Sequence, residues 1–483
     1  MYFRYLALGL VIFLSSCGSA GKMLRYGVPN VDDYKIFDKA ALLPSEKPFQ
    51  FYKISEKYML PPADLWACGD KPTYKLVSGY SPEQFLEESG TLALIVIRRD
   101  SILYEYYGNG HSRSSYSTVF SITKSFLSTM VGIAITDGLI KGPDQPVSDF
   151  LPEFAEGKKA DITIGHLLQM TSGMNFGDYD NLLKLGRLYY TKHQERLLKT
   201  IKIKYVPGTH FSYSSLGSYV LGMCLEKATG MRVADYMQQK IWTPLGMEYP
   251  AYLNMDRADG MPKVYAGLSA TAIDLAKLGR LFLHKGNWNG EQLVSNDYTT
   301  ACRTRNCGKD GGEIWNYSNH WWLDTYSGHI SAEDKNDFFA GGFHGQIIYV
   351  NPEDSTIIVR IGKTEKDIYW GRTVSKLAML PLGPDGDEFM QLGNDLFALM
   401  DGNYRNKKKD SSLKVHFEKG KLMVDNLITD GPIELVKDGL FSFVNTERDI
   451  KLIVNYSQHH VQGFIVQSPN EQTFFYKSET SGE

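Results

Sequence analysis

The sequence predicts a large α+β domain followed by a small all-β domain. Strand-like apolar runs stand near both ends of residues 81–385, and apolar residues at helical spacing occupy the middle. This order suits one sheet that the returning chain completes, with a helical subdomain inserted between its strands. Across residues 399–480, short alternating runs split by Gly, Asp and Asn replace the helical pattern, which indicates a β sandwich or an open barrel.

The first elements of the large domain are predicted to form a β hairpin. Leu92–Ile97 is a short apolar run, and Ile102–Tyr107 returns after a polar turn. A helical pattern then covers Ser121–Ile135, and Gly138 ends it. The remaining patterns follow in the order that an insertion within a sheet requires. They are helices at Ile164–Met170, Leu216–Thr229, Val233–Ile241 and Ala272–Leu283, then strands at Ile347–Val350 and Thr356–Ile361.

The composition is that of an ordinary globular protein. The chain has 483 residues, of which 43% are hydrophobic and 22% are charged, so wholesale disorder and coiled coil are disfavoured. The formal net charge is −3, and a nearly neutral chain lacks the basic stripe of a general nucleic-acid binder. Aromatic residues reach 13%, which favours strands and an aromatic-walled cleft.

The first residues predict an export signal rather than part of the fold. Residues 1–16 combine a positive charge at Arg4 with an apolar run too short to span a bilayer, and Cys17 follows in the string LSSC. This pattern is typical of a bacterial lipobox, in which the cysteine is lipidated. We therefore expect an exported, membrane-anchored lipoprotein facing the periplasm or the cell surface, with residues 17–80 as a lead-in. An ordinary secretory signal is the alternative.

The other cysteines and the histidines predict no metal and no cofactor. Cys302 and Cys307 are close enough in sequence to close a small disulfide loop, and Cys224 in its apolar helical pattern is expected to be buried. The cysteine spacing does not suit a zinc site. No His-Glu-x-x-His motif, glycine-rich dinucleotide motif or Walker loop occurs in the sequence, and His166 is expected to be structural.

The sharpest chemical feature is an S-x-x-K motif at Ser121 and Lys124. The same pattern begins at Ser19 and Ser411, but of the three serines only Ser121 opens a long apolar helix. Residues i and i+3 share one face of a helix, so the Lys124 ammonium can reach the Ser121 hydroxyl. A lysine held among apolar residues has a lowered pKa, which suits a general base. The alternative is a helix N-cap serine followed by a solvated lysine.

A second proton carrier is expected near this pair. Tyr213 lies in the segment PGTHFSYSS, just before the helical pattern at Leu216–Thr229, where a phenol can point into a cleft. In a chain rich in tyrosine, a half-buried packing residue is the alternative. Trp321 and Trp322, on a strand, are expected to pack rather than to stack on a substrate.

Several motifs taken together resemble one enzyme family. In chain order they are FSITKSFLSTMVGIAITDGLI, PVSDFLPEF, ITIGHLLQMTSGM, PGTHFSYSSLGSYVLG, WTPLGM and GLSATAIDLAKLGRLFLHKGNWNG. They are similar to the β-lactamase-related serine hydrolases, which include class C β-lactamases, D-alanyl-D-alanine carboxypeptidases and esterases, and most similar to the branch of 6-aminohexanoate-oligomer hydrolases. The resemblance covers roughly residues 85–382. It implies a β-lactamase/transpeptidase-like fold, with an antiparallel sheet flanked by helices and a helical subdomain.

The resemblance also assigns roles to single residues. It implies that Ser121 is the acylating nucleophile, Lys124 its general base and Tyr213 the proton shuttle. The backbone N–H groups of Ser121 and Phe343 would form the oxyanion hole, where one donor is typically worth about 10²–10³ in rate. Tyr179 matches a tyrosine that lines the substrate pocket in the aminohexanoate branch.

Two departures from the family motifs bear on the substrate. Ser215 stands where the Tyr-x-Asn motif has its asparagine, and Ala340 stands where the third motif has its cation. Nothing obvious at the third motif therefore grips the carboxylate of a β-lactam. We expect Ser215 and Gly342 to lie at the substrate, whereas His344 either replaces the missing contact or is structural.

The leading hypothesis is a lipid-anchored serine hydrolase that cleaves an ester or amide bond in a small-molecule or peptide-like substrate, without a cofactor. The second hypothesis is a penicillin-interactive D-Ala-D-Ala peptidase or β-lactamase. The third is a non-catalytic binding or sensor lipoprotein on the same fold, with the C-terminal β domain as its ligand module. The sequence leaves the oligomeric state open.

Overall fold

The computed structural model divides the chain into two compact units. Unit 1 comprises Met1–Ile54 and Leu86–Ser375, and unit 2 comprises Ser55–Phe85 and Lys376–Glu483. The predicted signal and Cys17 lie outside the described residues. The structure describes residues 18–54, 58–61, 63, 66–68, 80–307, 314–323, 336–380, 400–406, 411–418, 421–426, 431–439, 442–445, 447–448, 450–457, 460–468 and 471–477.

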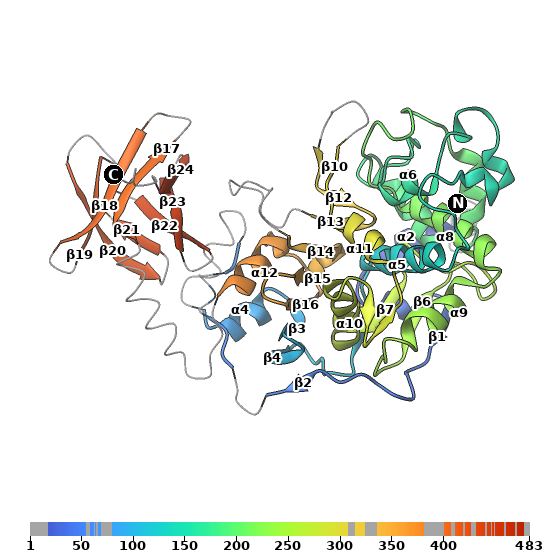
Figure 1. The fold of residues 1–483 in the computed structure, drawn as a ribbon, viewed down its shortest axis with the longest axis horizontal. Coiled ribbons are helices and arrows are strands. Elements are labelled where there is room, and N and C mark those ends of the chain that lie inside the picture. The colour runs from blue at the N-terminus through green and yellow to red at the C-terminus, as the bar shows by residue number, and fades with distance from the viewer. Residues whose placement is uncertain are drawn as a thin grey trace, which may run out of the picture. The chain divides into compact units, whose positions relative to one another are not determined.

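An eight-stranded sheet forms the framework of unit 1 (Figure 1). The predicted hairpin is present as β3 and β4, and the returning strand β16 pairs antiparallel with β3, with Ile358 opposite Val96. The described strand pairs are antiparallel except for β2 and β4. In sheet order the strands are β12 (Tyr317–Ser318), β13 (Trp321–Trp322), β14 (Phe338–Gly342), β15 (Gln346–Asn351), β16 (Thr356–Gly362), β3 (Thr91–Arg98), β4 (Ser101–Tyr107) and β2 (Tyr52–Lys53).

Two long helices pack near this sheet because their residues are apolar on most sides. Helix α10 (Ala272–Leu283) lies along β15, β16 and β3, and α5 (Ile122–Thr136) contacts β14 and β15. A Cβ on Gly279 would come within 2.9 Å of Ile357, so the glycine permits the close approach of α10 to the sheet. In α5 every residue from Ile122 to Ala134 is buried, as expected for a helix in the interior of a large domain.

The helical subdomain stands between the two halves of the sheet in sequence, as predicted. Helix α8 contacts both α5 and α6, and the region predicted as one helix at Val233–Ile241 is an α-helix followed by a π-helix. The helices here include α6 (Ile164–Leu168), α7 (Leu182–Tyr190), α8 (Ser215–Thr229), α9 (Val233–Met237) and the π-helix Gln238–Trp242. The remaining described α-helices are α2 (Ser19–Tyr26), α4 (Pro82–Glu88), α11 (Asn296–Ala301) and α12 (Trp370–Met379), besides α5 and α10.

A second, four-stranded sheet incorporates part of the segment predicted as a lead-in. Its outer strand β1 pairs with β6, with Ala40 opposite Leu253, so the lead-in up to Ile54 belongs to unit 1, whereas Ser55–Phe85 belongs to unit 2. Short strands of this kind leave too little side-chain periodicity for a sequence pattern to show. The sheet order is β1 (Lys39–Leu42), β6 (Ala251–Asn254), β7 (Leu268–Thr271) and β5 (Tyr116–Thr118); two small hairpins are β8 (Asn287–Trp288) with β9 (Glu291–Gln292) and β10 (Asn306–Cys307) with β11 (Ile314–Trp315).

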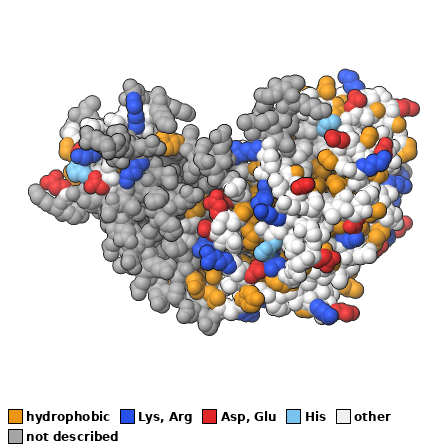
Figure 2. Space-filling view, in the orientation of Figure 1, with side chains coloured by type: hydrophobic (Ala, Val, Ile, Leu, Met, Phe, Trp, Pro, Cys, Tyr) orange, Lys and Arg blue, Asp and Glu red, His pale blue; other side chains and the backbone are white. Residues whose placement is uncertain are grey.

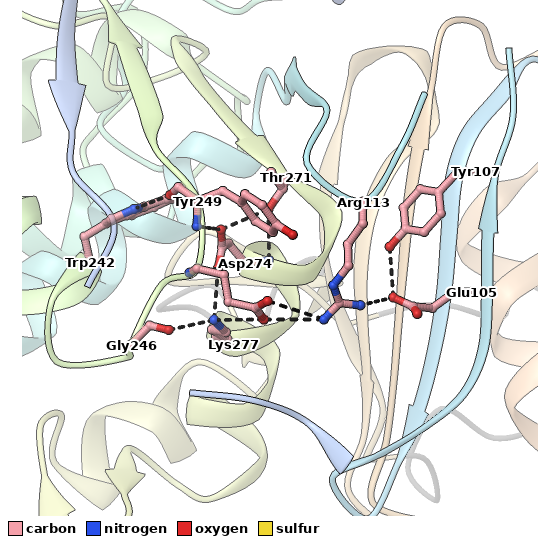
Figure 3. Close-up of polar contacts among 10 residues, drawn as sticks. Glu105, Tyr107, Arg113, Trp242, Gly246, Tyr249, Thr271, Asp274 and Lys277 are labelled. Carbon is pink, nitrogen blue, oxygen red and sulfur yellow. Dashed lines mark hydrogen bonds and ion pairs between the residues drawn. The ribbon is translucent and has the colours of Figure 1, made fainter. Parts of the chain in front are cut away.

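A buried ion-pair network links α10 to the chain that leads to Ser121 (Figure 3). Lys277 Nζ lies 3.0 Å from Asp274 and 3.4 Å from Glu248, and the Lys277 and Asp274 side chains are fully buried. Arg113, just before β5, contacts Glu248 and also Glu105 on β4. The network therefore ties α10, the loop after the π-helix and the start of β5 together.

Unit 2 contains a closed barrel of eight strands. The all-β prediction for this region is confirmed, but the expectation of a sandwich or an open barrel is wrong, because β17 pairs with β24 and joins the ends of the sheet at Tyr404 and Lys477. Closure removes the exposed edges of the sheet. The strands are β17 (Gly402–Asn406), β18 (Ser411–Glu418), β19 (Lys421–Asp425), β20 (Ile433–Gly439), β21 (Ser442–Asn445), β22 (Ile450–Ser457), β23 (His460–Ser468) and β24 (Glu471–Lys477).

The surface of unit 1 carries both signs of charge. On the face drawn in Figure 2, acidic and basic side chains are interspersed over the described part of this unit. Among the described helices, none combines the length and the apolar character that a bilayer-spanning helix requires.

Candidate active site

Ser121 lies at the sharp turn from β5 into α5. Phe120, the residue before it, has a φ of +49°, a left-handed conformation that is costly for a residue with a side chain. Ser121 is the N-cap residue of α5, but its side chain makes no capping hydrogen bond. The Ser121 hydroxyl therefore does not cap the helix, contrary to the capping alternative. The strained turn places this hydroxyl at the N-terminus of a buried helix.

Lys124 is buried and contacts Ser121, as the i and i+3 spacing predicts. Its Nζ donates hydrogen bonds to Ser121 Oγ at 3.0 Å, to Ser215 Oγ at 3.1 Å and to the Tyr265 carbonyl at 2.9 Å. The side chain is 1% exposed, so the alternative of a solvated lysine is wrong. Burial lowers the pKa of Lys124 to about 8, and the Asp178 carboxylate opposes this change.

Tyr213 joins the same cluster from the loop before α8. Lys124 Nζ lies 4.8 Å from the centre of the Tyr213 ring. Burial raises the pKa of the phenol, and a hydrogen bond with Ser121 opposes this rise. The ring stacks on Trp322 at 5.6 Å, so one of the paired tryptophans belongs to the site, whereas Trp321 packs against Phe282 in the core. A phenol that remains protonated can deliver a proton to a departing group.

Asp178 is a site residue that the sequence reasoning missed. Its carboxylate accepts hydrogen bonds from the Ser215 backbone N–H at 2.7 Å and from Ser215 Oγ at 2.5 Å. Because Ser215 Oγ also accepts from Lys124, the hydroxyl relays the position of the carboxylate to the lysine. Burial raises the pKa of Asp178, and the charge of Lys124 opposes that rise. The sequence Gly177-Asp178-Tyr179 could have indicated this residue, but only Tyr179 was predicted to lie at the site.

The end of β14 lies against the backbone that precedes Ser121. A Cβ on Gly342 would collide with the carbonyl oxygen of Val119, so this position requires a glycine. The Phe343 and Phe120 rings are in edge contact at 5.7 Å. Gly342 and Phe343 therefore contact the two residues that precede Ser121, and the Phe343 N–H as an oxyanion donor stays a prediction.

Arg360 is a second residue that the sequence reasoning missed. This fully buried side chain on β16 donates hydrogen bonds to the carbonyls of His344 at 3.0 Å and Gly345 at 2.7 Å. Its guanidinium also lies 3.5 Å from the centre of the Trp370 ring. Burial lowers the pKa of Arg360. Arg360 thus fixes the turn Phe343–Gly345 through hydrogen bonds to two of its carbonyls.

The ring of His344 is occupied by structural contacts. Its Nε2 lies 2.9 Å from the Pro29 carbonyl, and the ring packs at 4.0 Å on Phe343. The lining of the cavity beside Ser121 includes Phe343 and Gly345 but not His344. These contacts fit the structural alternative for His344, and its contact with a substrate stays a prediction.

A cavity of about 1080 Å³ lies beside Ser121. Its walls include four of the predicted substrate or oxyanion residues, namely Tyr179, Ser215, Gly342 and Phe343. The residues that line it from the N-terminal segment are Met23, Gly27, Val28 and Pro29, and those from α7 are Leu182, Leu185, Gly186, Tyr189 and Tyr190. Aromatic and aliphatic side chains dominate this lining.

The described residues hold no group of His, Cys, Asp and Glu side chains arranged for a metal ion. Cys224 is buried, as expected. Cys302 is a buried free thiol, and the side chain of Cys307 lies outside the described ones. His166 caps α6 in a reciprocal pair with Thr163, which is a structural role. The Ser121 cluster is thus built from a hydroxyl, an amine, a phenol and a carboxylate.

This combination of a half-buried serine at the start of a helix, a buried lysine three residues later and a nearby tyrosine agrees with the comparison of the whole sequence. Residues 83–367 match the family model described as Beta-lactamase. The chain belongs to the beta-lactamase family. As a member of this family it is a serine hydrolase, and its unit 1 has the β-lactamase/transpeptidase-like fold that the motifs predicted.

Similar proteins place this beta-lactamase-family member among hydrolases. It is 27% identical over 300 residues to the 6-aminohexanoate-dimer hydrolase of Paenarthrobacter ureafaciens, covering 58% of this chain and 74% of that protein. It is 31% identical over 176 residues to Esterase EstB of Burkholderia gladioli, covering 32% and 44%. The solved structure "Putative 6-aminohexanoate-dimer hydrolase from Bacillus anthracis" covers 74% of this chain and 92% of its own, with a TM-score of 0.61 and 20% identity, which shows the shared fold.

Proposed function

We propose that this protein hydrolyses an ester or amide through an acyl-enzyme on Ser121. The observation that carries the proposal is the buried Lys124 ammonium, 3.0 Å from Ser121 Oγ, with its pKa lowered to about 8. At that pKa a substantial fraction of the lysine is neutral near pH 8 and can accept the proton of the serine. A solvated lysine would not do this.

The reaction follows from the positions of three side chains. As Ser121 Oγ bonds to the substrate carbonyl carbon, its proton passes to Lys124 or Tyr213. The backbone N–H groups of Ser121 and Phe343 stabilise the oxyanion that forms. When the carbon–oxygen or carbon–nitrogen bond breaks, Tyr213 or Lys124 protonates the leaving group, and water then cleaves the acyl-enzyme by the reverse proton transfers.

A fluorophosphonate probe tests the nucleophile. Wild-type protein should be labelled and Ser121→Ala should not, because the probe phosphonylates an activated serine. Ser411→Ala is the matched control, since Ser411 opens another S-x-x-K pattern but begins strand β18 in unit 2. Equal labelling of Ser121→Ala and wild type would refute the assignment, and an unlabelled wild type that hydrolyses no ester or amide would support the non-catalytic alternative.

The β-lactam hypothesis has less support from the site. The Ala340 side chain, at the position of the third-motif cation, is fully buried in β14. Nitrocefin turnover or a stable penicillin adduct on Ser121 would reinstate this second function. Esters and linear amides are the substrates that we expect to react.

We further propose that the protein is exported and lipid-anchored through Cys17, on the sequence pattern LSSC after an apolar run. Cells grown with radiolabelled palmitate should yield labelled wild-type protein and unlabelled Cys17→Ser. Cys68→Ser is the control, because it removes another cysteine and leaves the lipobox intact. If Cys17→Ser were labelled as strongly as the wild type, lipidation at Cys17 would be refuted and the ordinary secretory signal would be the remaining interpretation.

A further inference from the structure

The cavity beside Ser121 offers little for a charged substrate to bind. Its charged lining residues are Asp178, Glu365 and Arg372. Asp178 is bonded to Ser215, Glu365 accepts a hydrogen bond from the Gly345 backbone at 3.2 Å, and Arg372 lies 5.2 Å from the Tyr369 ring. No lysine lines the described cavity. Because most of the other side chains of the lining are aromatic or aliphatic, this space favours a largely apolar substrate.

The rim of the same cavity is also apolar. Five of its large apolar or aromatic lining residues are exposed, by 45% to 78% of their surface: Val28, Tyr179, Leu182, Phe343 and Tyr369. Soluble proteins seldom expose contiguous apolar surface unless it binds something. Because these residues border the cavity that holds Ser121, the apolar surface continues from the rim to the reacting hydroxyl.

The wall that the N-terminal segment adds is held in place by specific contacts. Tyr190 on α7 donates a hydrogen bond to the Gly27 carbonyl at 3.0 Å, and His344 bonds the Pro29 carbonyl. Tyr189 donates to the buried Asp33 carboxylate at 2.8 Å. The wall from Met23 to Pro29 is thus a built part of the cavity, and sites of this kind are usually largely pre-formed.

We propose that the substrate of this site is an uncharged ester or amide that carries a long apolar chain, of about eight carbons or more. The chain occupies the space between α7 and the N-terminal wall while its carbonyl lies at Ser121. A cavity of about 1080 Å³ is at the upper end of the range for small-molecule sites and exceeds what a short-chain ester fills. The inference rests on the hydrolase function proposed above and adds the class of substrate.

A chain-length series tests this inference. p-Nitrophenyl esters from acetate to dodecanoate and alkyl acetates from ethyl to dodecyl place the chain on either side of the scissile bond. In at least one series kcat/KM should rise about two- to fourfold per methylene up to eight carbons, the factor expected for burying a CH₂ group. A carboxylate at the end of the octanoyl chain should lower kcat/KM at least tenfold.

Two neighbouring leucines provide a matched pair of variants. Leu182 and Leu183 are each 72% exposed on α7, but only Leu182 lines the cavity. Leu182→Asp should lower the ratio of kcat/KM for the octanoate ester to kcat/KM for the acetate ester about tenfold. Leu183→Asp should leave this ratio unchanged. Because both side chains are on the surface, loss of folding does not complicate the comparison.

The outcomes separate this inference from the proposed function. Flat or falling profiles in both series, with acetate hydrolysis that still depends on Ser121, would overturn the long-chain substrate and leave the hydrolase intact. Equal effects of Leu182→Asp and Leu183→Asp would likewise overturn it. Absence of Ser121-dependent hydrolysis for every ester and amide would instead refute the hydrolase itself.

Discussion

At the scale of single residues, the proposed mechanism makes the reactivity of Ser121 depend on the protonation state of Lys124. Lysine is normally protonated well above neutral pH, and a protonated amine cannot accept the serine proton. Burial without a full ionic partner lowers the pKa of Lys124 to about 8, and its hydrogen bonds to Ser121, Ser215 and the Tyr265 carbonyl hold the amine in place.

The pH dependence of hydrolysis should therefore report this lysine. Neutral Lys124 becomes more abundant as pH rises through about 8, so kcat/KM for an uncharged ester should rise with pH and level off above that value. Below pH 8 the rate should fall about tenfold per pH unit. A profile that is flat between pH 6 and 9 would contradict Lys124 as the base.

Asp178→Asn tests the residue that positions Lys124. Its charge raises the pKa of Lys124, so the substitution should move the midpoint of the pH profile to lower pH. Asparagine has one acceptor oxygen, so one of the two hydrogen bonds from Ser215 is lost. This should also lower kcat, by about 10- to 100-fold, because the lysine is less well placed. Measured pH–rate profiles give both quantities.

The control for Asp178→Asn is Asp180→Asn, an exposed position two residues further along the same loop. It should leave both the midpoint and kcat as in the wild type. If Asp178→Asn lowers the yield of folded protein but leaves the midpoint in place, Asp178 supports folding alone.

At the scale of elements, the proposed site depends on the turn after β14 as well as on the helix that begins after Ser121. Helix α5, the β3–β4 hairpin and α10 could be predicted because an apolar periodicity within a short segment reports a helix or a strand directly. The turn Phe343–Gly345 could be placed only through a family motif, because its position depends on β16. Arg360 supports the turn, but a lone arginine inside a strand pattern reveals nothing about its partners.

Arg360→Lys tests that support. A lysine keeps the positive charge but lacks the planar guanidinium, which both donates to two carbonyls and stacks on Trp370. The turn should therefore shift. We expect kcat to fall about 10- to 100-fold with a smaller change in KM, because an oxyanion donor acts mainly in the transition state.

Arg98→Lys is the matched control for this element. Arg98 lies on β3, where its Nε bonds Thr356 at the far end of β16 from the turn. The kcat and KM of Arg98→Lys should stay near those of the wild type. If both variants lose kcat equally, the effect belongs to the sheet and not to the turn.

At the scale of the whole molecule, buried charges join parts of unit 1 that are distant in sequence. The network around Lys277 connects α10 with Glu248 and, through Arg113, with β4 (Figure 3). Burial raises the pKa of Asp274, and the positive charge of Lys277 opposes that rise. Removing one partner of a buried pair leaves the other charge without compensation.

Lys277→Met should therefore lower the free energy of unfolding of unit 1 by about 3–5 kcal/mol. Lys240→Met is the control, because the Lys240–Asp137 pair has about a third of each side chain exposed and such pairs contribute about 0–1 kcal/mol. Urea unfolding followed by tryptophan fluorescence measures both. Equal losses of unfolding free energy in the two variants would show that the buried network contributes no more to stability than the exposed ion pair.

The sequence by itself determined the features that depend on neighbouring residues. Ser121 and Lys124 share a helix face at a spacing that helix geometry dictates, and the order of strands and helices predicted the architecture of unit 1. Tertiary structure alone decided which groups complete the site. Asp178 meets Ser215 across 37 residues, and Arg360 meets Thr91 across 269. Contacts of this kind, like the closure of the barrel and the depth of the apolar cavity, exist only after distant segments pack together, so no local pattern records them.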